Sequence, residues 1–122
     1  MAKISPFKAL RPEAQFAKAV ASKPYDVLSS EEAKIEAQGN PNSFLHITKS
    51  EIDLPATIDT HAPEVYQKAK ENLDAFISRK ILFREDKACY YIYKLVMNGH
   101  SQFGLVCTSS IDDYENGIIK KH

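Results

Sequence analysis

The sequence predicts an α+β fold, and two local patterns carry most of this prediction. Residues 63–80 place apolar side chains at helical spacing behind Pro63, which is typical of an amphipathic helix that begins at a proline. Residues 88–97 and 100–109 are apolar runs that flank Asn98-Gly99, a strong signal for a β-hairpin. We therefore expect a mixed, mostly antiparallel sheet with this hairpin at its centre, packed by the helix 63–80 and by short helices.

The hairpin prediction fixes a register. With Asn98 and Gly99 as the two loop residues, the turn is type I′, which matches the twist of the strands. The register pairs Met97 with His100, Lys94 with Phe103, Ile92 with Leu105 and Tyr91 with Val106. Large apolar side chains then fall on both faces, so we expect the hairpin to be central in its sheet and buried on both sides.

The same register, extended by two residues, also predicts the positions of the two cysteines. Cys107 would face Tyr90, and Cys89 would face Thr108. Because neighbouring residues of a strand point to opposite faces, the two thiols would project apart, and we expect no disulfide between them. Two cysteines at this spacing are neither a disulfide framework nor a zinc site.

The remaining segments predict short elements. Residues 4–12 form a short strand bracketed by prolines, 13–21 a short helix, 43–48 a strand, and 110–116 a capped helix. Ser29 or Ser30 begins a further helix, because a serine hydroxyl can accept a hydrogen bond from a free N–H of the first turn. The acidic residues that follow suit the positive end of that helix, and Gly39-Asn40-Pro41 ends it.

Length, composition and charge exclude several function classes. The chain has 122 residues, a length that predicts one domain. Its 16 basic and 16 acidic side chains balance, so it lacks the excess of basic residues with which proteins bind nucleic acid or an anionic membrane. No apolar run approaches the roughly 20 residues of a membrane helix, and the first ten residues hold no secretory core. We expect a cytoplasmic location and neither nucleic acid nor membrane as a partner.

Few residues suggest chemistry by their spacing alone. The four histidines do not fall in a metal-binding pattern, and the four glycines are too scattered to cradle a phosphate. Asp26, between Tyr25 and Val27 after Pro24, is the most informative single residue. Its carboxylate suits a helix cap or an Asx-turn, and it suits equally a base that projects into a cleft.

A series of motifs spans nearly the whole chain: ISPFKALRP, KPYDVLSSEEA, GNPNSFLHITKSEIDLP, VYQKAKENLDAFI, YYIYKLVMNG, QFGLV and DDYENGIIKKH. In this order they resemble the N-terminal region of the domain of unknown function 1015 family. The resemblance implies that residues 1–122 are a single N-terminal domain of a longer cytoplasmic protein. In that family a DGHHR-type motif follows further along, similar to that of free-serine kinases with a ParB-like fold, and no such motif occurs in this chain.

The resemblance thus implies a small-molecule kinase or phosphotransferase that acts on serine or phosphoserine, with ADP or ATP used by the longer protein and no cofactor in this segment. On that interpretation Asp26 is the catalytic acid or base, and Tyr25, Lys120, Lys121 and His122 lie near the pocket. The segment alone would be inactive. The competing interpretation is a non-catalytic interaction or dimerisation domain, in which the apolar hairpin binds a partner or a second copy of the chain.

Overall fold

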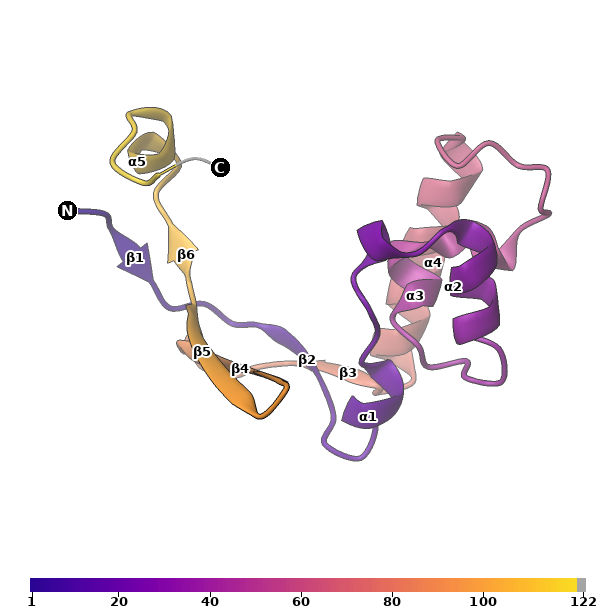
Figure 1. Cartoon of the computed structure of the whole chain (residues 1–122), viewed down its shortest axis with the longest axis horizontal. Helices are drawn as coiled ribbons and strands as arrows, with labels where there is room; N and C mark the ends of the chain where they lie inside the picture. The colour runs from indigo at the N-terminus through magenta and orange to yellow at the C-terminus, as the bar shows by residue number, and fades with distance from the viewer. Residues whose placement is uncertain (121–122) are drawn as a thin grey trace. The chain divides into compact units, whose positions relative to one another are not determined.

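The computed structural model describes residues 1–120 and divides the chain into two compact units. The helical unit is Arg11–Phe83, and the terminal unit combines Met1–Leu10 with the residues from Arg84 onward. The helical unit holds α1 (Ala17–Val20), η1 (Tyr25–Val27), α2 (Ser30–Glu36), α3 (Leu45–Thr48), η2 (Ser50–Asp53) and α4 (Pro63–Ser78). The terminal unit holds β1 (Ile4–Ser5), β4 (Tyr91–Met97), β5 (His100–Val106), β6 (Thr108–Ser109) and α5 (Ile111–Glu115) (Figure 1).

Helices and small two-stranded sheets occur together, which confirms the predicted α+β class. β2 (Leu10–Pro12) pairs with β3 (Leu82–Arg84), and the boundary between the two units falls within these strands. The other pairs are β1 with β6 and β4 with β5, both antiparallel. The hairpin was predicted at the centre of a mixed, mostly antiparallel sheet, whereas the strands of the described residues form three separate two-stranded ladders.

The helix starts follow the predicted capping chemistry. Ser29 caps α2 with a full capping box: its hydroxyl accepts the N–H of Glu32, and the Glu32 carboxylate accepts the N–H of Ser29. The hydrogen bond from the Ser29 backbone N–H, and next the one with its side chain, lowers the pKa of Glu32. Ser110 caps α5 in the same manner by accepting the N–H of Asp113.

The long helix also matches its prediction closely. α4 has Pro63 in its first turn and runs for 16 residues to Ser78, against a predicted span of 63–80. Lys80 has a φ of 58°, a left-handed backbone that commonly terminates a helix. Val65 and Phe76 are the buried side chains of its inner face, so the helix contributes an apolar stripe to the unit.

The core of the helical unit lies where α2, α3 and η2 meet. One cluster of this core consists of the buried residues Ala33, Ala37, Leu45 and Ile52, with the partly buried Leu28 packed against them. Alanines on α2 leave space for the larger side chains of the neighbouring elements. α4 packs against both α3 and η2, so three short elements and one long helix support one another.

Residues 43–48 were predicted as a strand, and this is wrong. Leu45–Thr48 form α3, in which the Thr48 and Lys49 amides bond to the carbonyls of Phe44 and Leu45. The β-branched and aromatic side chains of this segment have a strand-like composition. Tertiary packing overrides that local preference, because Leu45 becomes fully buried when the segment is helical.

The predicted hairpin register is confirmed over seven residue pairs, from Tyr91↔Val106 to Met97↔His100. Asn98 and Gly99 have φ values of 51° and 76°, as a type I′ turn requires. The predicted central and buried position is wrong: apart from the half-buried Tyr91, every residue of β4 and β5 is exposed.

The ladder stops before it reaches the cysteines. Cys89 pairs instead with Phe7 in an isolated bridge, and Thr108 pairs with Ser5 of β1. Both thiols are free and half-buried. The predicted absence of a disulfide is confirmed, although the partners predicted for the two cysteines differ from those observed.

Candidate functional site

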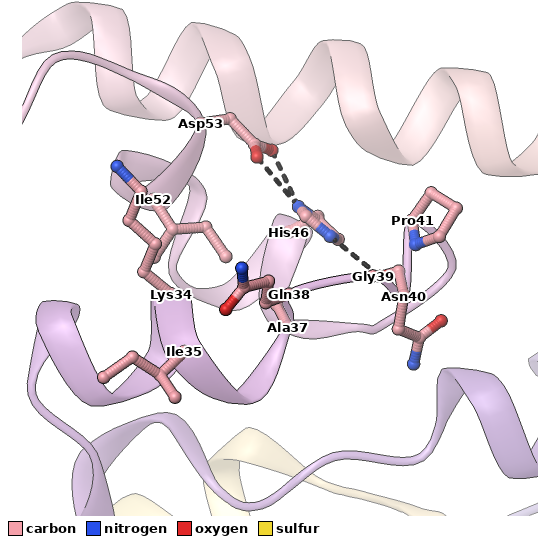
Figure 2. Close-up of a pocket in the computed structure, with 10 residues that line it drawn as sticks. All are labelled: Lys34, Ile35, Ala37, Gln38, Gly39, Asn40, Pro41, His46, Ile52 and Asp53. Carbon is pink, nitrogen blue, oxygen red and sulfur yellow. Dashed lines mark hydrogen bonds and ion pairs between the residues drawn. The ribbon is translucent and has the colours of Figure 1, made fainter.

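A pocket of about 640 Å³ opens at the C-terminal end of α2, within the size range of small-molecule sites. Ten residues from α2, the α2–α3 loop, α3 and η2 line it: Lys34, Ile35, Ala37, Gln38, Gly39, Asn40, Pro41, His46, Ile52 and Asp53. Figure 2 shows these side chains, with Asp53 and Asn40 bonded to His46 on two sides. All ten belong to the helical unit, so one compact body forms the whole pocket.

His46 is held through both of its ring nitrogens. Its Nδ1 lies 2.9 Å from each carboxylate oxygen of Asp53, and its Nε2 lies 3.0 Å from the backbone carbonyl of Asn40. A carbonyl and an ionised carboxylate can only accept hydrogen bonds. Both contacts are therefore hydrogen bonds at the same time only when both ring nitrogens carry protons, and the ring is then an imidazolium cation.

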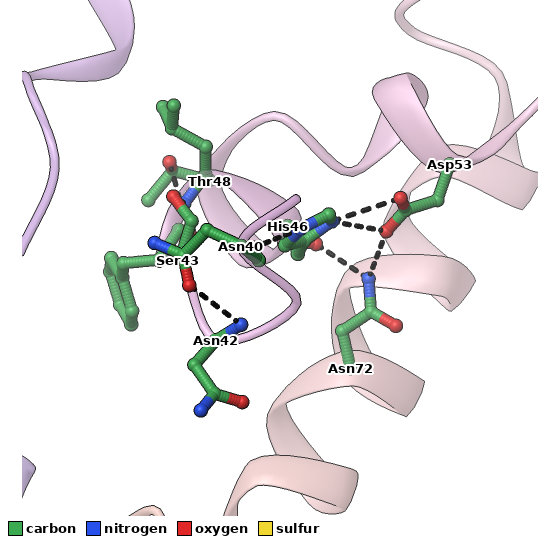
Figure 3. Close-up of polar contacts among 9 residues, drawn as sticks. Asn40, Asn42, Ser43, His46, Thr48, Asp53 and Asn72 are labelled. Atoms are coloured by element: carbon green, nitrogen blue, oxygen red, sulfur yellow. Dashed lines mark hydrogen bonds and ion pairs between the residues drawn. The ribbon is translucent and has the colours of Figure 1, made fainter. Parts of the chain in front are cut away.

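Asn72 of α4 completes the network (Figure 3). Its side-chain amide donates to the backbone carbonyl of His46 at 2.6 Å and to Oδ2 of Asp53 at 3.0 Å. The Asp53 carboxylate thus accepts from two side chains. The side chains of His46 and Asp53 are only 17% and 26% exposed, which reduces solvent screening and strengthens their attraction relative to a surface pair.

The α2–α3 loop is fixed at its own end. The side chain of Asn40 donates to the carbonyl of Ala19 at 2.7 Å and accepts the N–H of Asn42 at 3.2 Å. Arg79, just beyond α4, donates to the side chain of Asn42 at 2.7 Å. These bonds hold the loop, and with it one wall of the pocket, in a defined position before any ligand arrives.

The lining combines an apolar wall with charge at the rim. Ile35, Ala37 and Ile52 give the apolar surface, and Ile35 is 71% exposed, which is unusual for an isoleucine. Lys34 and Asp53 are the lysine and the carboxylate of the lining, and the Asp53 carboxylate lies against His46. The pocket therefore has the size of a ligand site, an apolar wall and a lysine ammonium among its polar groups.

The residues that the sequence predicted as functional lie elsewhere. Tyr25 and Asp26 are exposed residues of η1 in the helical unit and do not line this pocket. Lys120 is an exposed residue of the terminal unit beyond α5. Lys121 and His122 lie outside the described residues, so the predicted grouping of these side chains stays a prediction.

Sequence reasoning missed the His46 network. His46 and Asp53 are seven residues apart, and no familiar motif has that spacing. Asn72 lies 26 residues beyond His46, and amide side chains give no periodic signal. Residues 43–48 were predicted as a strand, whereas the helix α3 places His46 beside η2 and α4. A correct helix prediction there would have been the available signal for this network.

Within residues 1–120, no group of three or more His, Cys, Asp or Glu side chains is placed to hold a metal ion. Across the same residues, none of the helices has the length and apolar character required to cross a lipid bilayer.

The comparisons with known proteins identify a family. Neither the curated proteins nor the solved structures include a match to this chain. Among protein families, residues 4–122 match the one described as "Protein of unknown function (DUF1015)". Since this match covers almost the entire chain, the protein belongs to the DUF1015 family.

Proposed function

We propose that this chain is the ligand-binding N-terminal part of a small-molecule kinase or phosphotransferase that acts on serine or phosphoserine, and that it is inactive alone. The structural observation that supports this proposal is the pocket at the C-terminal end of α2. The reaction class comes from the resemblance of the family to free-serine kinases. A cytoplasmic location, as expected from the sequence, belongs to the same proposal.

Lys34 supports a ligand with an anionic group. Serine carries a carboxylate, and phosphoserine adds a phosphate with one to two further negative charges near neutral pH. Lys34 would contact the anion directly, since its ammonium has three donors and lies at the rim. Both ring nitrogens of His46 lie against Asp53 and Asn40, so His46 would hold the pocket wall in place rather than contact the ligand.

The residues predicted from the sequence keep their roles in the proposal. Asp26 would orient or deprotonate the substrate hydroxyl, with Tyr25 beside it. Lys120, Lys121 and His122 would neutralise phosphate charge. Asp26 shares a unit with the pocket without lining it, so its participation is a separate question that its own variant must answer.

No nucleotide is assigned to this segment. Nucleotide phosphates are usually cradled by glycine-rich loops or by helix N-termini, whereas the pocket lies at the C-terminal end of α2 and contains a single glycine, Gly39. ADP or ATP would be held mainly by other parts of the longer protein. This chain would contribute the amino-acid side of the reaction.

Calorimetric titration of the chain with serine, phosphoserine, ADP and ATP tests the proposal. We expect phosphoserine to bind most tightly, and Lys34→Ala to weaken that binding at least several-fold. Lys18→Ala, which removes an exposed lysine that does not line the pocket, should leave it unchanged. Absence of binding by all four compounds would contradict the ligand site, and turnover by residues 1–122 would contradict the claim that the segment is inactive alone.

Activity requires a separate test in the longer protein. Asp26→Asn should reduce phosphoryl transfer between nucleotide and serine, while serine still binds with its normal affinity. Unchanged transfer in this variant would remove Asp26 from the mechanism and leave the pocket unaffected.

One observation favours the second candidate function, a non-catalytic interaction or dimerisation domain. The hairpin β4–β5 carries large apolar side chains that are between 40% and 73% exposed, and they occur on both of its faces. Contiguous exposed apolar surface commonly marks a site for another protein. Association of the chain without any small-molecule binding would support this second function over the first.

A further inference from the structure

Two Asn-Gly pairs occur in this chain, Asn98-Gly99 and Asn116-Gly117, and both are exposed to solvent. Asparagine is among the thermally labile residues of proteins. The backbone nitrogen of the residue that follows it can attack its side-chain amide, and a glycine leaves that nitrogen most accessible because it has no Cβ. The chain therefore holds two sites of similar intrinsic chemistry in different backbone settings.

The first pair is the two-residue turn of the hairpin, where Asn98 and Gly99 have φ values of 51° and 76°. Among the described residues, the Gly99 N–H donates to no acceptor. Apart from its chain neighbours, no atom lies within 4 Å of the position that a Cβ on Gly99 would take. The flanking residues add no cover, because Met97 and His100 are exposed. The nitrogen of Gly99 is therefore open to solvent.

The second pair is held by hydrogen bonds at the end of α5. Asn116 is the C-terminal cap of that helix. The Gly117 N–H donates to the carbonyl of Tyr114 at 3.3 Å, and the Ile119 N–H donates to the carbonyl of Asp113 at 3.1 Å. The nitrogen that would attack at this site is already a hydrogen-bond donor. It must leave that bond before it can reach the asparagine side chain.

We propose that Asn98-Gly99 is a site of spontaneous deamidation, and that this modification changes the hairpin turn. The Gly99 nitrogen gives its proton to hydroxide and bonds to Cγ of Asn98, while Nδ2 of Asn98 takes a proton from water and leaves as ammonia. The product is a five-membered succinimide ring. Water then adds across one of its two C–N bonds. Cleavage of the bond to Cγ gives aspartate, and cleavage of the bond to the main-chain carbonyl carbon gives isoaspartate.

The two products differ in their effect on the turn. Aspartate keeps the normal backbone, and Asp-Gly suits a type I′ turn as well as Asn-Gly does. Isoaspartate leads the main chain through Cβ and Cγ of residue 98, which lengthens the backbone by a methylene group. The pair Met97↔His100, which closes the turn, then loses its two-residue geometry. Either product adds a negative charge to a chain whose 16 basic and 16 acidic side chains balance.

The rate at each site depends on how often its backbone leaves the folded conformation. Attack on Asn98 requires rotation about the bond between its Cα and its carbonyl carbon, which takes the residue out of the turn. A two-stranded hairpin whose apolar side chains are exposed opens at little cost in free energy. The turn should therefore react faster than the hydrogen-bonded end of α5. This inference involves neither the pocket nor Asp26, so it is independent of the proposed transferase activity.

Incubation of the chain at mildly alkaline pH, followed by peptide mass spectrometry, tests the proposal. Each conversion replaces an amide with an acid, and chromatography separates the aspartate and isoaspartate peptides. We expect Asn98 to convert several-fold faster than Asn116 in the folded chain. In concentrated urea, which removes the structure, the two rates should converge. Equal rates in the folded chain, or faster conversion of Asn116, would overturn the proposal.

Asn98→Asp separates the added charge from the change in the backbone. This variant has the charge of both products with a normal main chain, so nuclear Overhauser contacts across the pairs Met97↔His100 and Val96↔Ser101 should be retained. The purified isoaspartate form should lose these contacts and keep the signals of α4 unchanged. Retention of the same cross-strand contacts in the isoaspartate form would contradict the proposed effect on the turn.

Discussion

The helical unit and the hairpin differ in how far their large apolar side chains are buried. In the helical unit, Leu45 and Ala33 are completely buried, and the polar groups around them are paired. In the hairpin, Ile92 and Phe103 are 73% and 65% exposed, although the strands pair in full register. The strands of the hairpin thus pair in full register while their large apolar side chains stay exposed, whereas the helical unit encloses a buried apolar cluster.

This difference shows that a sequence can specify a local structure without making that structure stable. An Asn-Gly turn and alternating strands fix a hairpin register locally, but a hairpin without a packed face is at best marginally stable in water. Burial of apolar side chains is the main force that stabilises a fold. The helical unit buries apolar side chains against one another within the unit. The apolar side chains of the hairpin are exposed, so burial does not stabilise it in the same way.

The largest expected effect is on the core of the helical unit. Leu45→Ala would leave a cavity among Ala33, Ala37 and Ile52, and we expect it to lower the free energy of unfolding by about 2–5 kcal/mol. Urea denaturation followed by circular dichroism measures this loss. Ile35→Ala is the control, because that side chain is 71% exposed and its removal should change stability little. Similar losses in both variants would show that the core is not where we place it.

Removal of the Asp53 carboxylate should have the next largest effect. Asp53→Ala leaves the imidazole of His46 and the amide of Asn72 without a shared acceptor, and we expect a loss of about 1–3 kcal/mol in the same unfolding assay. Asp74→Ala on α4 removes a carboxylate that forms only an exposed i,i+4 pair with Lys70. An Asp53 variant as stable as the Asp74 variant would contradict the network.

The capping box predicts a smaller loss. Ser29→Ala removes the acceptor for the N–H of Glu32, and we expect the loss of this cap to lower the free energy of unfolding by about 1 kcal/mol. Ser22→Ala, an exposed serine outside any helix, is the matched substitution. Thermal unfolding of the two variants side by side distinguishes a cap from a generic serine effect.

The smallest expected effect is the dependence of stability on pH through Glu32. Its folded pKa is lowered by its bonds to Ser29, so its stabilising contribution is fully present above the unfolded pKa. That contribution is lost as the pH falls through the lowered folded value. Glu32→Gln should therefore flatten the stability profile on the acid side and leave the neutral region with the same slope. An unchanged acid limb would contradict this role.

The elements that the sequence predicted correctly have causes within a few residues. Pro63 and the apolar spacing behind it specify α4, Ser29 specifies the start of α2, and Asn98-Gly99 specifies the register of the hairpin. In each case the determining hydrogen bond or backbone conformation is local. Tertiary packing then has little to alter.

The features that the sequence did not predict depend on distant contacts. Residues 43–48 are helical because Leu45 enters a core built from α2 and η2. The candidate site depends on Asn72 reaching back to His46 and Asp53. The hairpin was expected to be buried because its composition is that of a buried strand. Composition alone does not show which residues, if any of this chain, would cover its apolar side chains.

Amide hydrogen exchange of the dilute, monomeric chain tests this contrast most directly. Slow exchange should be confined to the helical unit, with the strongest protection in α2, α3 and α4, where buried side chains support the backbone bonds. The amides of β4 and β5 should exchange much faster despite their complete register. Protection of the hairpin amides equal to that of α4 in the monomer would contradict the account, because the hairpin would then be stable without a partner.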